Sequence, residues 1–149
     1  MNDWKDIETQ KDIDVLMESF SGFHDSCLVS MNYISGNKVQ DNGSMTFGTP
    51  NDYQLNMIFD NQYGESVELC FQGVRRMHLV GLQDNYLADI FCASIAFYEN
   101  IMPSKYTAPQ RCIVWADDGS FDVSKIDHSL NEPAVTYIIA HALKWRKIT

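Results

Sequence analysis

Several features of secreted and membrane-spanning proteins are missing from this sequence. The first residues, MNDWKD, are polar and lack the apolar stretch of a secretory signal. No run of residues approaches the roughly 20 apolar positions of a membrane span. The four cysteines (Cys27, Cys70, Cys92 and Cys112) are far apart and form no C-x-x-C pair. We therefore expect a cytoplasmic protein whose cysteines are reduced and buried.

The motifs of common enzyme classes are missing as well. The sequence contains no P-loop, no G-x-G-x-x-G, no G-x-S-x-G and no H-E-x-x-H. It therefore offers no support for a nucleotide-binding, hydrolase or metalloprotease function. We expect neither a cofactor nor a metal.

Positive charge is scarce, with 11 Lys and Arg residues against 20 Asp and Glu residues and a net charge of -9. Such a chain repels the phosphates of nucleic acids and of anionic membranes, so we expect neither as a partner. The acidic surface fits either simple solubility or a protein partner with a basic face.

Alternating apolar residues organise the centre of the chain. Every second residue is apolar between residues 53 and 59, and again between residues 67 and 71. Residues 61–64 supply a turn between the two stretches. This two-residue period predicts a β-hairpin with one apolar face. Gly73 then interrupts the pattern, as a bulge or a bend would.

The rest of the chain supplies one helix and further strands. Residues 3–20 predict an N-terminal helix that ends at Ser21-Gly22, or a shorter helix capped by Asp12. Further strands are predicted near residues 27–34, 45–47, 92–98, 111–116 and 121–123. At 149 residues the chain can bury a sizeable core. We expect a single α+β domain over residues 1–149, with the helix packed on a mainly antiparallel sheet of six to eight strands.

Residues 136–148 are ambiguous. As a strand they would place Tyr137, Ile139 and His141 on one face, whereas a helix would cluster Ile138, Ile139 and Ala142. Their β-branched and aromatic content favours the strand.

His24 and Asp25 are the most suggestive polar pair, between the predicted helix and the next strand. Adjacent side chains of an extended segment point to opposite faces, so we expect no hydrogen bond between them. A local role for Asp25 at the turn is the favoured interpretation. A catalytic His24 would need a nucleophile or a substrate site from elsewhere in the fold.

A second cluster of candidate ligands contains Asp117, Asp118, Asp122, Asp127 and His128. It lacks the spacing of a calcium loop and the His and Cys content of a zinc site. We favour a hairpin turn of the Asp-Gly kind with solvated carboxylates. The alternative is a small enzyme in which His24 or His128 acts with the carboxylates of Asp117, Asp118, Asp122 and Asp127.

Two surfaces are candidates for a partner. The acidic residues Asp6, Asp14 and Glu18 belong to the predicted helix and are either simply solvated or face a basic partner. Near the C-terminus, Trp145 and Arg146 are candidate anchor residues. Basic residues there would also protect an exposed strand edge from aggregation.

Four segments carry a resemblance to a family. They are Gly22–Ser26 (GFHDS), the strand Val67–Val74, Val114–Asp118 (VWADD) and Ile139–Arg146 (IAHALKWR). In this order they resemble a family of small uncharacterised bacterial α+β proteins, some of which resemble immunity proteins of bacterial toxin systems. The resemblance implies a non-enzymatic binding protein that blocks a cognate toxin. It carries over no catalytic residues.

Overall fold

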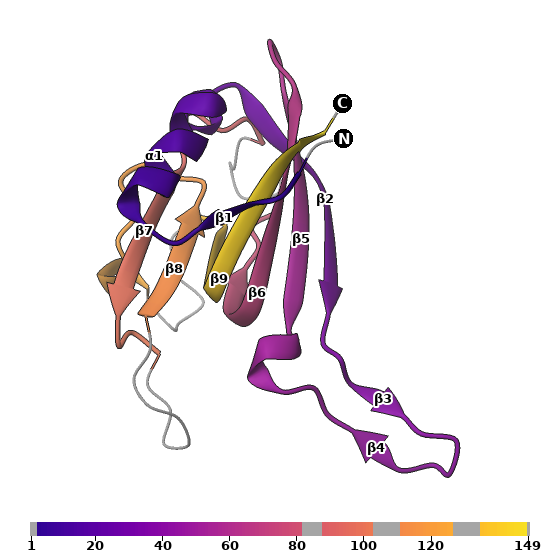
Figure 1. The fold of residues 1–149 in the computed structure, drawn as a ribbon. Helices are drawn as coiled ribbons and strands as arrows, with labels where there is room; N and C mark the ends of the chain where they lie inside the picture. The colour runs from indigo at the N-terminus through magenta and orange to yellow at the C-terminus, as the bar shows by residue number, and fades with distance from the viewer. Residues whose placement is uncertain (1–2, 82–87, 103–110, 127–134, 149) are drawn as a thin grey trace.

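The computed structural model describes residues 3–81, 88–102, 111–126 and 135–148. Figure 1 shows a curved sheet with one helix at its side and a narrow hairpin that projects from the body. The regular elements are β1 (Lys5–Ile7), α1 (Gln10–Ser19), β2 (Ser26–Ile34), β3 (Lys38–Val39), β4 (Met45–Thr46), β5 (Gln54–Asn61), β6 (Ser66–His78), β7 (Ser94–Glu99), β8 (Arg111–Ala116) and β9 (Tyr137–Ile148). Short 3-10 helices lie at Ser21–Phe23, Pro50–Asp52 and Val123–Lys125.

The main sheet has seven strands, in the order β2-β5-β6-β9-β8-β7, with β1 also paired to β9. Every pairing is antiparallel. The predicted α+β fold, with an N-terminal helix and a mainly antiparallel sheet of six to eight strands, is therefore confirmed. The predicted hairpin at its centre is β5 and β6.

Strand β9 holds the sheet together. Along one side it pairs with β6 over most of its length. Along the other side Tyr137–Ala140 pair with β8, and Leu143–Trp145 pair with β1. The strand interpretation of residues 136–148 is thus confirmed. Strand β9 pairs with strands on both of its sides, and a helix in its place would leave the backbone groups of those strands unpaired.

Helix α1 begins later than the sequence predicted. Thr9 is its N-cap, and the Asp12 carboxylate accepts the backbone N–H groups of Glu8 and Thr9. These two hydrogen bonds lower the pKa of Asp12. Residues 5–7 form β1 instead of helix, because Ile7 enters the core while pairing with Leu143. Among the described residues no helix is long and apolar enough to span a bilayer.

The larger core lies between the sheet and α1. It contains Leu16 of the helix and the fully buried aromatic residues Phe23 and Phe59. Ile113 and Trp115 point into this core, whereas Cys112 and Val114 join a second cluster on the other face of β8 and β9. Both faces of β8 are therefore buried, which explains its nearly continuous apolar sequence.

The predicted strand at residues 121–123 is wrong. Val123–Lys125 form a 3-10 helix, and Asp117–Ser120 join no hairpin. Strand β8 already pairs with β7 on one side and β9 on the other, so no edge is left for a following strand. Of the strand predicted at residues 92–98, residues 94–98 lie in β7.

The four cysteines carry free thiols, but only two are buried. Cys70 and Cys112 lie in the sheet, at 2% and 1% exposure. Cys27 and Cys92 are exposed, which corrects the expectation that all four are buried. Cys27 is the second residue of the edge strand β2 and pairs with Asp60 of β5.

Alkylation of the native protein without reductant should modify Cys27 and Cys92 rapidly and leave Cys70 and Cys112 unmodified. Burial shields the latter two and raises the pKa of both thiols, which lowers the reactive thiolate fraction. Intact-mass measurement should show two adducts in the native state and four after unfolding. Four adducts at equal rates in the native state, or fewer than four after unfolding, would contradict this assignment.

Candidate functional site

The segment that joins α1 to β2 has an unusual backbone. Ser21, Phe23 and Asp25 have φ angles of 53°, 64° and 58°, in the left-handed region that non-glycine residues rarely adopt. Gly22 between them has a φ of 62°. Each strained residue costs on the order of 1 kcal/mol or more, so surrounding contacts must hold this conformation.

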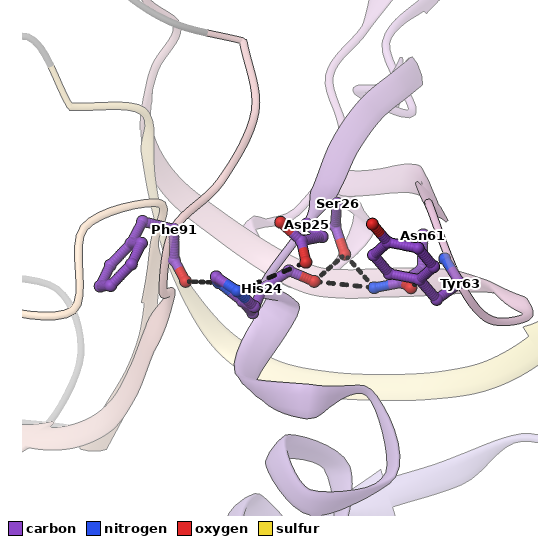
Figure 2. Close-up of polar contacts among 6 residues, drawn as sticks. All are labelled: His24, Asp25, Ser26, Asn61, Tyr63 and Phe91. Atoms are coloured by element: carbon purple, nitrogen blue, oxygen red, sulfur yellow. Dashed lines mark hydrogen bonds and ion pairs between the residues drawn. The ribbon is translucent and has the colours of Figure 1, made fainter.

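The left-handed turn brings the His24 and Asp25 side chains together. Nε2 of His24 lies 3.3 Å from Oδ2 of Asp25, and Nδ1 lies 2.7 Å from the carbonyl oxygen of Phe91 (Figure 2). The expectation that the pair cannot meet is wrong, because it assumed an extended backbone at Asp25. The His24 ring also packs edge-on against Phe91, at 5.2 Å between ring centroids.

The backbone around His24 ties three segments of the chain together. Nδ2 of Asn61 donates to the His24 carbonyl oxygen at 2.8 Å and to Oγ of Ser26 at 2.9 Å (Figure 2). The Asp25 N–H donates to the Ile90 carbonyl, and the Asp25 carbonyl accepts from residue 62. These bonds join the start of β2 to the β5–β6 turn and to residues 90–93.

This arrangement does not form a nucleophile–base pair. The Ser26 hydroxyl is buried and faces the His24 backbone carbonyl at 3.5 Å, not the imidazole ring. A catalytic serine would need its hydroxyl against a ring nitrogen. The geometry supports the structural interpretation of the His24–Asp25 segment, with one change: the Asp25 carboxylate contacts His24 instead of turn amides.

The carboxylates that follow β8 accept hydrogen bonds from nearby turns and from the segment that precedes β9. Asp118 accepts the N–H and the hydroxyl of Ser120, and Asp122 accepts the N–H of Ser124. Asp117 accepts the N–H of Thr136 at 3.0 Å. Asp127 and His128 lie outside the described residues.

The described members of this group do not come together with His24. Within the part of the chain that the structure describes, His24 makes no hydrogen bond or ion pair with Asp117, Asp118 or Asp122. In the same part of the chain, no group of three or more His, Cys, Asp and Glu side chains could hold a metal ion.

The residues predicted to bind a partner do not form one surface. Asp14 and Glu18 are exposed on α1, but Asp6 alternates with buried Ile7 and points to the opposite face of the sheet. Trp145 is only 2% exposed, so its prediction as an anchor residue is wrong. Its place in β9 makes it a core side chain, with the Lys5 ammonium 4.9 Å from its ring centroid.

Arg146 is held by an ion pair that the sequence did not reveal. Its Nε and Nη2 atoms both lie 2.8 Å from Oε1 of Glu68, and Nδ2 of Asn56 donates to Oε2 at 2.9 Å. The Arg146 guanidinium also lies 4.4 Å from the ring centroid of Trp4. Glu68 is 8% exposed, so these contacts offset the cost of burying its carboxylate. They also hold the Arg146 guanidinium in place, which makes it less available to a partner.

The structure also has an exposed apolar surface that the sequence analysis did not predict. It comprises the edge strand β2 and the hairpin arm formed by β3 and β4, which projects away from the body beyond β2 and β5 (Figure 1). We call it the β2–arm surface and define it by its large exposed apolar residues, which are 45–68% exposed: Val29, Tyr33, Ile34, Val39, Met45 and Phe47. The sequence contained a sign of this surface. Three of its apolar residues, Val39, Met45 and Phe47, stand in the polar, glycine-containing stretch 39–49, which has few other apolar residues to pack against them.

Comparisons of this chain with protein families, with curated proteins and with solved structures found no match.

Proposed function

We propose that this chain is a non-enzymatic binding domain that holds a protein partner along the β2–arm surface. The observation that carries this proposal is the free edge of β2 continued by the exposed apolar arm. Strand β2 pairs with β5 on one side. On its other side a single bridge joins Ser26 to Ile90, and the described residues supply no strand beside Cys27–Ile34.

A free edge strand is a template for a further strand. Its unpaired backbone groups can pair with an extended segment of a partner, while alternate side chains provide the apolar contact. Proteins usually protect such edges with charges or proline, and the sequence of β2, SCLVSMNYI, contains neither. Exposed apolar surface of this kind is typical of interaction sites.

Charge favours a partner with a basic face. Between residues 25 and 60 the only basic residue is Lys38, against the four carboxylates of Asp25, Asp41, Asp52 and Asp60. With the net charge of -9, these residues would attract a basic protein and speed its association at low salt.

The partner class follows from the resemblance in the sequence. The FHDS and WADD segments and the strand that ends in Trp-Arg resemble a bacterial family with immunity-type members. We therefore propose a cytoplasmic inhibitor that blocks a basic bacterial toxin by occlusion, burying on the order of 800 Å² on each partner. The small-enzyme alternative would need a reacting group beside His24, and the contacts of His24 described above do not support it.

The test uses the protein encoded by the neighbouring gene, because an inhibitor is usually encoded beside its toxin. Val39→Asp and Phe47→Asp should each raise the Kd at least about 30-fold, as expected for hot-spot residues of an interface. Isothermal titration calorimetry at low and moderate salt measures the effect. Phe91→Asp and Tyr63→Asp are matched controls, because these aromatic residues are 81% and 80% exposed but lie outside the β2–arm surface.

Two outcomes would contradict the proposal. Binding that is lost on charge reversal of Asp14 and Glu18, yet unchanged in Val39→Asp and Phe47→Asp, would assign the interface to α1. A dimer of the isolated chain in analytical ultracentrifugation that dissociates in Phe47→Asp would assign the β2–arm surface to a second copy.

A further inference from the structure

The arm that projects from the body in Figure 1 has one apolar face and one polar face. Val39 of β3 pairs directly with Met45 of β4, so these two side chains share a face, and they are 66% and 67% exposed. Alternation along the chain places Phe47 on the same side as Met45. Lys38 pairs with Thr46 on the opposite face. The apolar side chains of the arm are therefore gathered on one side of it.

The polar face of the arm is closed by a hydrogen bond of its own. Nε2 of Gln40 donates to Oγ1 of Thr46 at 2.7 Å, from one strand of the arm to the other. Lys38, the only basic residue between residues 25 and 60, lies on this face as well. Asp41 stands in the turn at the tip. A basic partner therefore meets no like charge on the apolar face and a carboxylate at its end.

The root of the arm is fixed by contacts between its two strands. Oδ1 of Asn37 accepts the backbone N–H of Gly48 at 2.7 Å, which ties the start of the arm to its end. Gly48 lies so close to Ser35 that an added Cβ would overlap the Ser35 carbonyl oxygen. The Asp52 carboxylate then accepts the N–H and the hydroxyl of Thr49. A two-stranded hairpin is only marginally stable by itself, so these contacts hold the arm in one orientation.

We infer that the arm docks as a preformed element through its apolar face alone, and that Asn37 and Gly48 are positioning residues for this contact. The inference rests on the proposed function. It assigns to the partner an apolar patch bordered by basic residues, which covers Val39, Met45 and Phe47 and leaves the polar face in solvent. A rigid arm loses little conformational freedom on binding, so more of the contact energy appears as affinity. Loosening the root lowers the fraction of molecules whose arm is ready to bind.

The first test adds a carboxylate to one face of the arm or to the other. Met45→Asp should raise the Kd for the protein encoded by the neighbouring gene at least about tenfold, because it places a charge inside the apolar contact. Thr46→Asp is the matched control, since the two positions are adjacent and exposed but lie on opposite faces. Its Kd should stay within about twofold of the native value. Equal losses in the two variants would overturn the one-sided contact.

The second test loosens the root, and surface plasmon resonance follows the two rate constants. Asn37→Ala removes the acceptor of the Gly48 N–H and should lower the association rate constant by about three- to tenfold, because fewer molecules hold the arm in place. The dissociation rate constant should not change. Asn37→Asp keeps an acceptor oxygen at this position and should restore the association rate constant at moderate salt. Faster dissociation in Asn37→Ala would make Asn37 a direct contact and overturn its positioning role.

The stiffness of the arm can be measured in the native chain without a partner. The backbone order parameters of residues 38–39 and 45–46 should be close to about 0.8, and should fall below about 0.6 in Asn37→Ala. Values below about 0.6 in the native chain would overturn the preformed arm. The absence of any complex with the neighbouring protein would overturn the proposed function together with this inference. A complex that is weakened by Val39→Asp but unaffected by Asn37→Ala would overturn this inference alone.

Discussion

Replacing Phe23 by alanine is expected to lower the free energy of unfolding by about 3–5 kcal/mol. Phe23 is completely buried and packs edge-to-face against Phe20, Phe59 and Trp115, with centroid distances of 4.9, 5.2 and 5.8 Å. It thereby connects the end of α1 to β5 and β8. The strained backbone on both sides of it is held partly by this packing, so the alanine variant loses contacts without releasing the strain.

Urea unfolding monitored by tryptophan fluorescence measures the effect. Phe91→Ala is the matched control, because the same change is made at a side chain that is 81% exposed, and its effect should stay within about 0.5 kcal/mol. A loss below about 1.5 kcal/mol in Phe23→Ala would show that the α1–β2 junction is not anchored in the core through this ring.

Replacing Gly73 by alanine is expected to destabilise the protein by about 2–4 kcal/mol, from backbone strain and a steric clash together. Gly73 has a φ of 66°, and an added Cβ would lie 2.8 Å from Cδ2 and 3.0 Å from Cβ of His141 on the neighbouring strand. The pairing of β6 with β9 shifts register between Val74 and Arg76, just after this position. The irregularity predicted at Gly73 therefore lies just after it, and Gly73 itself has a left-handed backbone.

A matched set of variants separates strain from clash. Gly43→Ala tests strain alone, because Gly43 has a φ of 88° with no atom near its added Cβ, and should cost about 1 kcal/mol. The double variant Gly73→Ala/His141→Ala removes the contact of the added Cβ with the His141 ring, which at 2.8 Å is the shortest one, and keeps the contact with the His141 Cβ. The coupling energy between the two substitutions should be at least about 1 kcal/mol. Additive effects in this cycle would rule out the His141 ring as the source of the clash.

These measurements belong at about pH 8, well above the ordinary pKa of histidine, where His141 is neutral in both states. Burial, and then the Arg75 guanidinium, lower the pKa of His141 in the folded protein. Below about pH 6.5 the unfolded chain therefore takes up the proton first, and stability falls until the pH reaches the lowered pKa of the folded state. At pH 8 this contribution does not enter the comparison.

Local periodicity predicted most of the longer strands well, including the edge strand β2. The alternation of residues 53–71 predicts β5 and β6, and the β-branched content of residues 136–148 predicts β9. The strand at residues 121–123 failed because a local Asp-Gly signal does not reveal that β8 already has two partners. The first turn of the predicted helix failed because Ile7 pairs with a strand about 140 residues away.

The candidate sites depended more on tertiary structure. The His24–Asp25 contact requires a left-handed backbone at Asp25. Aspartate adopts this conformation only occasionally, so the residue type alone did not predict it. Exposure was also predicted wrongly in both directions. Trp145, predicted on the surface, is buried, and Cys27, predicted in the core, is exposed. Exposure depends on which elements cover a strand, and that covering comes from distant parts of the chain.

The sequence by itself determined the class of fold, the acidic charge and the central hairpin, because side-chain alternation, charge and turn residues act over a few neighbouring positions. Only the tertiary structure decided which strand is left as a free edge, which tryptophans are buried and which carboxylate meets Arg146. These features depend on strand order and register, in which residues as distant as Glu68 and Arg146 become neighbours. Pairing between such distant segments is selected by the packing of the whole core, so no local pattern in the chain specifies it.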